Sequence, residues 1–245
     1  MAISANTLFH FTSKKDNIKG ILKNHFFPKY SLEDLSNVIP GSQILAAHIP
    51  MVCFCDLPFS QIKNHIDFYG DYGIGLKKKG WGIGKGISPI FYIPKGSNSA
   101  KLIKSTAALF KTANKDSNPL TQRFPDFFKY TKSYGGLALN KRTTKMENRE
   151  FYNEREWRFT PNNFPVLEEK GTKESFLIEE NMKMENGAQL TFKAKDIKYI
   201  IIKKEFEIPE FVDFIENDLK EQFEEHERKL LVSKLISVQQ IRDDM

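Results

Sequence analysis

Apolar residues in the first part of the chain recur at two spacings, which predict strands and helices in turn. β-Branched and aromatic residues fill 7–12 (TLFHFT), a composition typical of a strand. Ser13 can cap a helix, and the apolar residues of 18–22 follow it at helical spacing. The compact apolar run 50–57 (PMVCFCDL) leads into a proline and predicts a buried strand. We therefore expect two early strands separated by a helix.

The middle of the chain continues this pattern and then changes to helical spacing. Segment 60–70 (SQIKNHIDFYG) predicts a helix that stops at its glycine, and YGIGL (72–76) predicts another strand. A glycine-rich loop then leads to a further strand at 89–94 (PIFYIP). Residues 97–135 have the apolar spacing of two helices. A helical insertion between strands is therefore expected there.

Extended patterning returns in the second half of the chain. Strands are expected at 151–159 (FYNEREWRF), 189–192 and 197–203 (IKYIIIK), whereas 208–245 is expected to be a helical C-terminal region. Strands and helices do not alternate regularly enough for a doubly wound sheet. The pattern therefore predicts a single α+β domain over residues 1–245.

Composition narrows the class of protein. Hydrophobic residues make up 40% of the chain and charged residues 28%, as in ordinary globular proteins rather than disordered ones. The first residues lack the features of a secretory signal, and the longest apolar runs are far shorter than the ~20 residues of a membrane span. Cys53 and Cys55 are the only cysteines and would lie on one face of a strand, where they could not easily bridge. We therefore expect a cytoplasmic protein without membrane contact.

Charge adds a weaker indication. The formal charge of +6 and the pI near 9.1 imply a positive field that could attract nucleic acid. Lysines gather in 77–85 and again in 101–115, while 216–227 is largely acidic. The alternative is that these lysines are simply solvated on an exposed loop and helix.

Several catalytic motifs are missing from the sequence. The stretch KKGWGIGKG lacks the spacing of a P-loop, and the sequence contains no G-x-S-x-G, no H-E-x-x-H and no C-x-x-C pair. No metal site is therefore predicted.

His10 is the first candidate for chemistry. It shares one face of the first predicted strand with Thr12, because side chains alternate along a strand. The two side chains together could hydrogen-bond ribose hydroxyls or an amide. The alternative is a histidine satisfied in the core or at a sheet edge.

Glu154 and Glu156 form the second candidate. In an extended segment they would share one face, with Arg155 on the other, and their like charges would repel. One carboxylate could stabilise an oxocarbenium-like centre while the other orients the nucleophile. The alternative is a solvated strand whose glutamates pair with Arg155, Arg158 or neighbouring lysines.

Tyr69 and Tyr72 flank Gly70 between a predicted helix and a predicted strand. They could stack on a flat heteroaromatic ring, since glycine lets the backbone approach closely. An ordinary turn is the alternative.

Three motifs together resemble the AbiGi abortive-infection family. They are LFHFT near the start, PMVCFCDLPFSQIKNH followed by YG-x-YGIGL, and E-x-E-W-R-F. The middle block, 50–76, is the most specific part, and the likeness extends over about 7–160. This resemblance implies a role in phage resistance, and the family's usual label implies the antitoxin half of a toxin–antitoxin pair with a protein partner.

A more distant resemblance is to the His-Tyr-Glu layout of ADP-ribosyltransferases, including DarT-type toxins. It implies a mixed or antiparallel sheet core and NAD as the substrate, with Glu156 or Glu154 driving the transfer. NAD would then be bound by the first strand and a tyrosine, namely His10, Phe11, Thr12 and Tyr69 or Tyr72. The acceptor would be RNA, DNA or a translation component, and the candidate contacts with a nucleic acid are Lys77, Lys78, Lys79 and Lys85.

Three hypotheses follow from these features. The first is a mono-ADP-ribosyltransferase toxin that acts in phage defence. The second is a non-catalytic antitoxin or sensor that binds a partner protein, and the third is a nucleic-acid-binding module without turnover. Labelling from NAD would distinguish the first, and neutralisation of a neighbouring toxin would distinguish the second.

Overall fold

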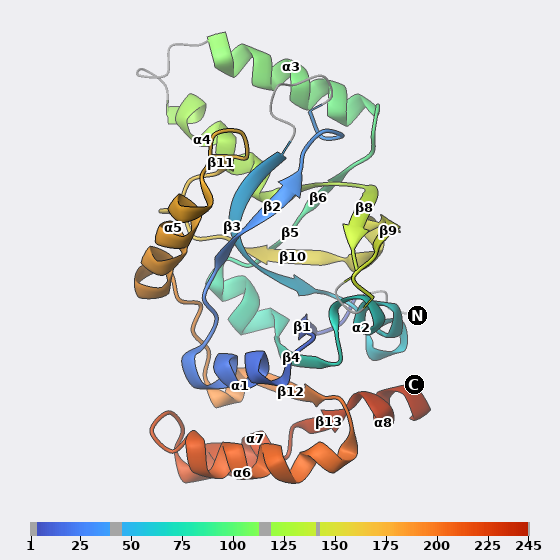
Figure 1. The fold of residues 1–245 in the computed structure, drawn as a ribbon, viewed down its shortest axis with the longest axis vertical. Helices are drawn as coiled ribbons and strands as arrows, with labels where there is room; N and C mark the ends of the chain where they lie inside the picture. Colours follow the sequence, from blue (N-terminus) through green and yellow to red (C-terminus); the bar gives the residue numbers. More distant parts are fainter. Residues whose placement is uncertain (1–3, 40–45, 113–118, 141–142, 245) are drawn as a thin grey trace.

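A mixed β-sheet forms the centre of the computed structural model, which describes residues 4–39, 46–112, 119–140 and 143–244 (Figure 1). The main path of the sheet, in spatial order, is β13 (Leu235–Ser237), β12 (Ile197–Ile202), β4 (Tyr72–Lys77), β1 (Thr7–Thr12), β3 (Ala46–Cys55), β10 (Glu156–Phe159) and β5 (Ser88–Pro89). Two further strands pair with β3, namely β2 (Lys29–Asp34) and β11 (Leu167–Glu168). Within this sheet the β12–β13 pair is parallel and the other pairs are antiparallel. The expected α+β class with a mixed sheet is therefore confirmed.

Side-chain alternation along β1 divides the protein between two hydrophobic cores. Leu8 packs into the larger core, whereas Phe9 and Phe11 pack into the smaller core on the opposite face. The larger core includes residues of α1 (Lys15–Asn24), α6 (Ile208–Asp218) and α7 (Glu225–Val232), and the smaller includes residues of α2 (Lys63–Tyr69) and α8 (Val238–Asp244). The aromatic strand predicted at 7–12 therefore lies between the two cores.

The helical insertion is present and packs against the far half of β3. It comprises α3 (Asn98–Thr112) and α4 (Pro119–Phe127), which lie at the top of Figure 1. Ala100 and Ile103 share a third core with Ala47 of β3 and Leu35. The strands on either side of the insertion, β6 (Phe91–Ile93) and β7 (Thr131–Ser133), pair in parallel as a separate small sheet. The insertion therefore returns the chain close to where it left.

The segment 151–159 departs from the expected continuous strand. Residues Phe151–Glu154 form a 3₁₀ turn (η5), and Arg155 is left-handed with φ of 47°. Only the second half of the segment is a strand. This strand, β10, begins at Glu156, which pairs with Cys55 of β3. The expectation that Glu154 and Glu156 share one face of an extended chain is therefore wrong, although both still line one cavity, as described below.

Other elements also differ from the sequence patterns. Segment 189–192 is not a strand and contributes only an isolated bridge between Phe26 and Leu190. The C-terminal region is not wholly helical, since β13 adds a parallel edge strand to β12. Several elements were not expected: β2, β7 and β11, the hairpin of β8 (Gly135–Leu139) and β9 (Met146–Glu150), and α5 (Glu174–Gly187).

The sheet opens between β1 and β3. These two strands share a single residue pair, Phe9 with Cys55, and β3 pairs with β2 and β11 over its first half. Beyond that pair, a hydrogen bond from a side chain connects the two strands. Nδ1 of His10 lies 2.8 Å from the carbonyl oxygen of Cys53, so this nitrogen carries the proton and donates it. His10 is therefore fixed at the opening between two halves of the sheet.

Candidate functional site

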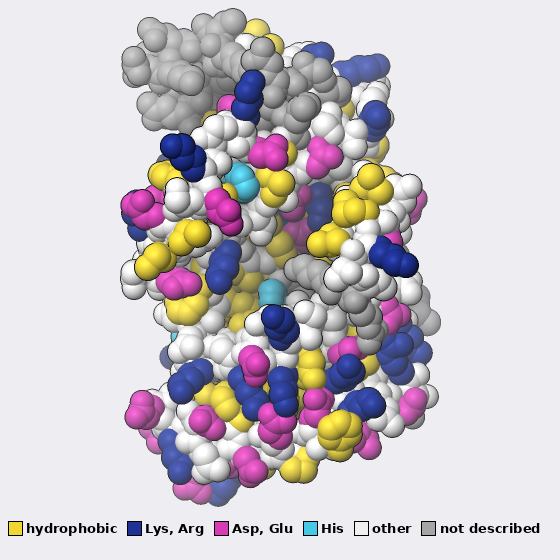
Figure 2. All heavy atoms as spheres, viewed as in Figure 1, with side chains coloured by type: hydrophobic (Ala, Val, Ile, Leu, Met, Phe, Trp, Pro, Cys, Tyr) yellow, Lys and Arg dark blue, Asp and Glu magenta, His cyan; other side chains and the backbone are white. Residues whose placement is uncertain are grey.

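A cavity of about 390 Å³ lies at the opening between β1 and β3. The face of the molecule seen in Figure 2 is hollowed near its middle, where charged and hydrophobic side chains meet. The cavity collects candidates from three separate parts of the sequence. Among its lining residues are Phe9, His10, Phe11, Cys53, His65, Tyr69, Lys132, Glu154 and Glu156. The structure thus brings together His10, Phe11, Tyr69 and both glutamates.

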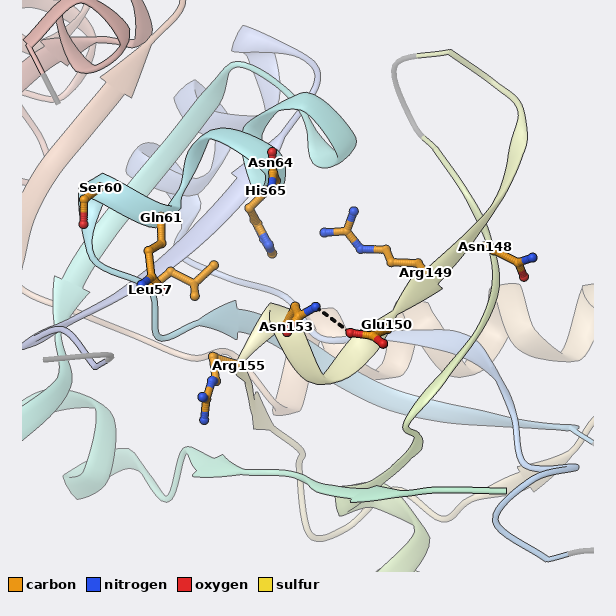
Figure 3. Close-up of a pocket in the computed structure, with 10 residues that line it drawn as sticks. All are labelled: Leu57, Ser60, Gln61, Asn64, His65, Asn148, Arg149, Glu150, Asn153 and Arg155. Atoms are coloured by element: carbon orange, nitrogen blue, oxygen red, sulfur yellow. Dashed lines mark hydrogen bonds between the residues drawn. The ribbon is translucent and has the colours of Figure 1, made fainter. Parts of the chain in front are cut away.

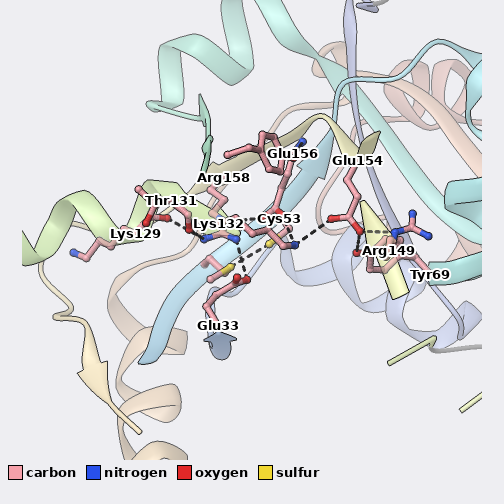
Figure 4. A network of polar contacts seen from close by, with 12 residues as sticks. Glu33, Cys53, Tyr69, Lys129, Thr131, Lys132, Arg149, Glu154, Glu156 and Arg158 are labelled. Carbon is pink, nitrogen blue, oxygen red and sulfur yellow. Dashed lines mark hydrogen bonds and ion pairs between the residues drawn. The ribbon is translucent and has the colours of Figure 1, made fainter. Parts of the chain in front are cut away.

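Glu154 is held by three donors at the end of η5 (Figure 4). The hydroxyl of Tyr69 donates to Oε1 at 2.6 Å, and Nε of Arg149 donates to the same oxygen at 2.8 Å. Nζ of Lys132 donates to Oε2 at 3.1 Å. Burial, and then the nearby Glu154 carboxylate, raise the pKa of Tyr69 well above its usual value, which keeps this hydroxyl a donor. A tyrosine and a glutamate from distant segments therefore meet as one unit.

Glu156 is held equally firmly at the start of β10. Its Oε1 accepts from Nε of Arg158 at 2.5 Å, and its Oε2 accepts from Nζ of Lys132 at 2.9 Å. Its backbone N–H donates to the hydroxyl of Tyr92 at 2.8 Å. Burial alone would raise the pKa of Glu156, but Arg158 and Lys132 outweigh it and hold the pKa well below its usual range. Glu156 is therefore an anion throughout the physiological pH range.

Charge is balanced within this buried network. Arg158 is completely buried and also donates from Nη2 to Glu33 at 2.8 Å. The network contains three carboxylates, Glu33, Glu154 and Glu156, and three cations, Lys132, Arg149 and Arg158. Glu154 and Glu156 are only 2% and 5% exposed, so the alternative is wrong about solvation, but its pairing of a glutamate with Arg158 is confirmed. Charges fixed in a buried site that contains little water interact more strongly than charges at the protein surface.

Gly70 places Tyr69 in this network. Its φ of 129° is a conformation that side chains rarely adopt, and it ends α2 directly against β1. A Cβ at this position would lie 2.4 Å from the carbonyl oxygen of Thr12. The glycine therefore lets the end of α2 approach β1 closely, rather than a bound ring. This packing places Tyr69 beside Glu154.

A second cavity of about 540 Å³ adjoins the first. The two share His10, Ser31, Met51 and Cys53 as lining residues. The larger one continues along α1 and the start of β2, where it is lined by Asp16, Asn17, Gly20, Asn24, His25, Phe26 and Lys29 among others. His10 stands at the junction, its ring 5.3 Å from that of Phe26 in an edge-on contact. The combined space is an elongated cleft with a histidine at its middle.

Two predicted site residues lie outside the lining of these cavities. Thr12 is buried and its hydroxyl accepts from Asn17 at 2.6 Å. Tyr72 lies on the α6 side of the sheet, where its hydroxyl donates to Glu207 at 2.7 Å. Of the two candidate tyrosines, the structure therefore brings only Tyr69 to the glutamates.

The predicted lysine group is divided by the fold. Lys78 is buried, and its ammonium donates to Asp56 at 2.8 Å and to Ser4. Lys77 and Lys79 are exposed, and Lys85 donates to Thr191 at 3.0 Å. Lys78 therefore has a structural role, and these residues do not form one continuous surface patch.

Sequence patterns did not single out two of the three cations of the site, Lys132 and Arg149. Lys132 follows the insertion and Arg149 lies on an unexpected hairpin strand, so neither has a local motif that marks it. Arg158, two positions after Glu156, was one of the expected partners of the glutamates. Alternation along β10 places it on the same side as Glu156, and the two side chains pair.

Among the described residues, no group of three or more histidine, cysteine or acidic side chains is arranged to hold a metal ion. Both cysteines are free, and burial raises the pKa of each thiol above its usual value. No helix in the described part of the chain is long and apolar enough to cross a bilayer.

We predict that His65 makes folding sensitive to acid. Burial, and then Arg149, lower its pKa from 6.5 to about 3, so the folded protein disfavours the protonated ring. The unfolded chain binds a proton first, and stability is therefore lost as pH falls from 6.5 towards 3, by about 1.4 kcal/mol per pH unit. Urea unfolding of His65→Gln across this range should have a shallower pH dependence than that of the wild type. The exposed His226→Gln is the control, and an unchanged slope in His65→Gln would refute the assignment.

Comparisons with known proteins identify one family. Residues 24–203 match the protein family described as abortive phage resistance protein AbiGi, antitoxin. A protein of Lactococcus lactis subsp. cremoris named abortive phage resistance protein AbiGi is 24% identical over 248 residues, which cover 89% of this chain and 99% of that protein. No solved structure matches the chain. Since the matched region takes in β3, α2 and the carboxylate network, the chain belongs to the AbiGi family of abortive phage resistance proteins.

Proposed function

We propose that this phage-resistance protein is a mono-ADP-ribosyltransferase that uses the cleft between β1 and β3 to bind NAD. The observation that carries the proposal is the convergence of His10, Tyr69, Glu154 and Glu156 on one cavity. These residues come from sequence positions up to 146 apart, and the fold alone unites them.

The cleft suits a dinucleotide in size and polarity. Its two adjoining cavities, of about 390 and 540 Å³, lie within the range of about 300–1,000 Å³ that is typical of ligand pockets. The proposal assigns the nicotinamide ribose to the smaller cavity, beside the glutamates. The rest of NAD extends past His10 towards α1, where Lys29 supplies positive charge for the pyrophosphate and Phe26 a ring edge.

The chemistry follows from a fixed anion beside the ribose. The glycosidic bond between the ribose C1′ and the nicotinamide nitrogen breaks, and nicotinamide leaves with the bonding electron pair. Glu156 offsets the positive charge that develops at C1′, as carboxylates do for oxocarbenium-like centres. The acceptor then bonds to C1′ and gives up a proton, for which Glu154, which lines the same cavity, serves as the base.

The experiment is incubation of the purified chain with NAD labelled in the adenine, together with cell extract. Label in a macromolecular fraction, matched by released nicotinamide, is the expected result. Release of nicotinamide without any labelled macromolecule would reduce the activity to NAD hydrolysis. An unchanged NAD pool in extracts of both infected and uninfected cells would contradict the proposal.

A second function, that of a non-catalytic antitoxin, is favoured by the description of the family itself. The feature that suits it is an apolar face on the β8–β9 hairpin. Leu137 and Leu139 of β8 and Met146 of β9 are 64%, 53% and 59% exposed. They lie on one side of the hairpin, because Leu139 pairs with Met146 and side chains alternate. Exposed apolar patches of this kind are characteristic of protein-binding surfaces.

The antitoxin role predicts a specific loss of function. Leu137→Asp combined with Met146→Asp should abolish neutralisation of the toxin encoded beside this gene, measured as colony formation under co-expression. Leu102→Asp, at an equally exposed position on α3, should leave neutralisation intact. Full protection by the hairpin variant would exclude this surface as the partner site, and failure of the wild-type chain to protect would exclude the antitoxin role.

A further inference from the structure

Lys132 connects the two glutamates of the cleft (Figure 4). Its ammonium nitrogen donates to Oε2 of Glu154 at 3.1 Å and to Oε2 of Glu156 at 2.9 Å. Each arginine of the network pairs with only one of these two glutamates, Arg149 with Glu154 and Arg158 with Glu156. Among the described residues, Lys132 is therefore the cation that both carboxylates share.

Lys132 also differs from the two arginines in what it faces. It lines the cavity of about 390 Å³ together with both glutamates, whereas Arg158 is completely buried. Arg149 lines a separate cavity of about 580 Å³ between α2 and β9, where Figure 3 shows its guanidinium directed towards His65. A ligand in the smaller cavity of the cleft would therefore lie beside two carboxylates that a single ammonium bridges.

The small sheet beside the insertion holds Lys132 in this position. β6 and β7 pair in parallel, and Tyr92 is the register partner of Lys132. The two side chains therefore project to the same side of the small sheet. The hydroxyl of Tyr92 accepts from the backbone N–H of Glu156 at 2.8 Å, while Lys132 binds the carboxylate of the same residue. The small sheet thus holds Glu156 at two points.

The surroundings of Lys132 keep it charged. The ring of Phe151, which is itself buried, lies with its centroid 4.6 Å from the ammonium nitrogen, a favourable contact for a cation. Burial alone would lower the pKa of Lys132, but Glu156, Glu33 and Glu154 outweigh it and raise this pKa well above its usual value. Lys132 is therefore a fixed cation throughout the physiological pH range.

Without this cation the two carboxylates could not both stay ionised. Like charges that share a site raise the pKa of one member of the pair, because the second ionisation is opposed by the first. Glu33 lines the same cavity, so removal of Lys132 would leave three carboxylates with two arginines. The other titratable or charged groups packed around the pair are His10 of β1, Glu33 of β2, Cys53 of β3, His65 and Tyr69 of α2, Tyr92 of β6, Arg149 of β9 and Arg158 of β10.

We infer that Lys132 is the positioning residue that keeps Glu154 and Glu156 ionised together in the cleft. The inference rests on the proposed function for the reaction, but the ionisation of the pair can be measured without NAD. Glu156 offsets the charge at C1′ only as an anion, and Glu154 takes up the proton of the acceptor only while it is unprotonated. One bridging ammonium therefore serves both steps of the transfer.

The first test follows urea unfolding of the wild type, Lys132→Met and Lys132→Arg from pH 5 to 8. In Lys132→Met the folded pair retains a proton that the unfolded chain has released, so its folded pKa is the higher one. The stability that this proton contributes is lost as the pH rises. The difference in the free energy of unfolding between the wild type and Lys132→Met should therefore widen from pH 5 to 8.

Two further variants complete this test. The difference should stay constant for Lys132→Arg, which keeps the cation, and for Lys104→Met, which removes an exposed lysine of α3. A constant difference for Lys132→Met would overturn the inference. If Lys132→Met does not fold at pH 8, the added change Glu154→Gln should restore folding, because it removes one of the two opposed charges. A double variant that is also unfolded would show that Lys132 acts through packing and would overturn the inference.

The second test is the pH profile of nicotinamide release at saturating NAD. For Lys132→Met, the pH of half-maximal turnover on the acidic side should lie at least about one unit above that of the wild type. Lys132→Arg should keep the profile of the wild type. An equal loss of turnover at every pH would overturn the inference and leave the transferase proposal standing. Absence of turnover in the wild type, combined with a widening difference in the unfolding test, would overturn the transferase proposal and leave the role of Lys132 in the ionised pair standing.

Discussion

Glu156→Gln is expected to lower the rate of transfer from NAD by about 100-fold or more, the loss seen when one electrostatic stabiliser of a transition state is removed. Glu156 is held as an anion by Arg158 and Lys132, and it lines the same cavity as Tyr69 and His10. Glutamine keeps the shape and one oxygen acceptor but not the charge that offsets the ribose cation. The measurement is the initial rate of nicotinamide release at saturating NAD and acceptor.

Two companion proteins make this loss specific. Glu210→Gln removes an exposed glutamate that pairs with Lys15 and Lys19, and its rate should equal that of the wild type. The urea midpoint of Glu156→Gln is measured beside its rate, because the variant leaves the buried Arg158 with Glu33 as its one carboxylate partner among the described residues. A folded Glu156→Gln protein with wild-type turnover would show that this carboxylate is structural.

Arg158→Met is expected to cost about 3–5 kcal/mol of stability, the range for breaking a buried ion pair from one side. Arg158 is fully buried and donates to Glu156 and Glu33, and from Nη1 to the backbone carbonyls of Lys129 and Thr131. Methionine fills much of the volume but leaves two carboxylates without this cation. Urea unfolding followed by the fluorescence of Trp81 and Trp157 gives the free energy of unfolding directly.

Arg155→Met is the matched control for this change, three residues away in the same segment. Arg155 contacts Tyr152 through ring stacking and is only partly buried, so a loss within about 0.5 kcal/mol is expected. Adding Glu156→Gln and Glu33→Gln to Arg158→Met should recover part of the lost stability, since it removes the uncompensated charges. If Arg158→Met were as stable as the wild type, the network could not be the support of the site.

The fold was predictable wherever apolar periodicity and burial coincide. Segments 7–12, 72–76 and 197–203 have strong apolar patterns because their strands lie between two cores, and each forms the expected strand. β2 was missed because its sequence, KYSLED, is mostly exposed and polar, and its backbone pairs with a strand that is distant in the sequence, β3. Its presence depends on a partner strand, which local sequence does not reveal.

Only some of the side chains of the site could be predicted from the sequence. His10 and the Glu154 and Glu156 pair could be selected because residue type and spacing are visible in sequence. Their neighbours Lys132 and Arg149 could not, because they reach the cavity through the return of the insertion and an unexpected hairpin. The left-handed turn at Arg155 was likewise hidden, since nothing in FYNEREWRF requires it.

Binding of NAD to the purified chain is the most direct test of the central claim that the opening between β1 and β3 is a dinucleotide site. Isothermal titration calorimetry of the wild type should give saturable binding of one NAD per chain. His10→Ala should weaken it by at least about tenfold, because His10 lines both adjoining cavities. Tyr72→Phe, on the α6 side of the sheet, should bind as the wild type does. No detectable binding by the wild type, or equal affinity in His10→Ala, would contradict the account.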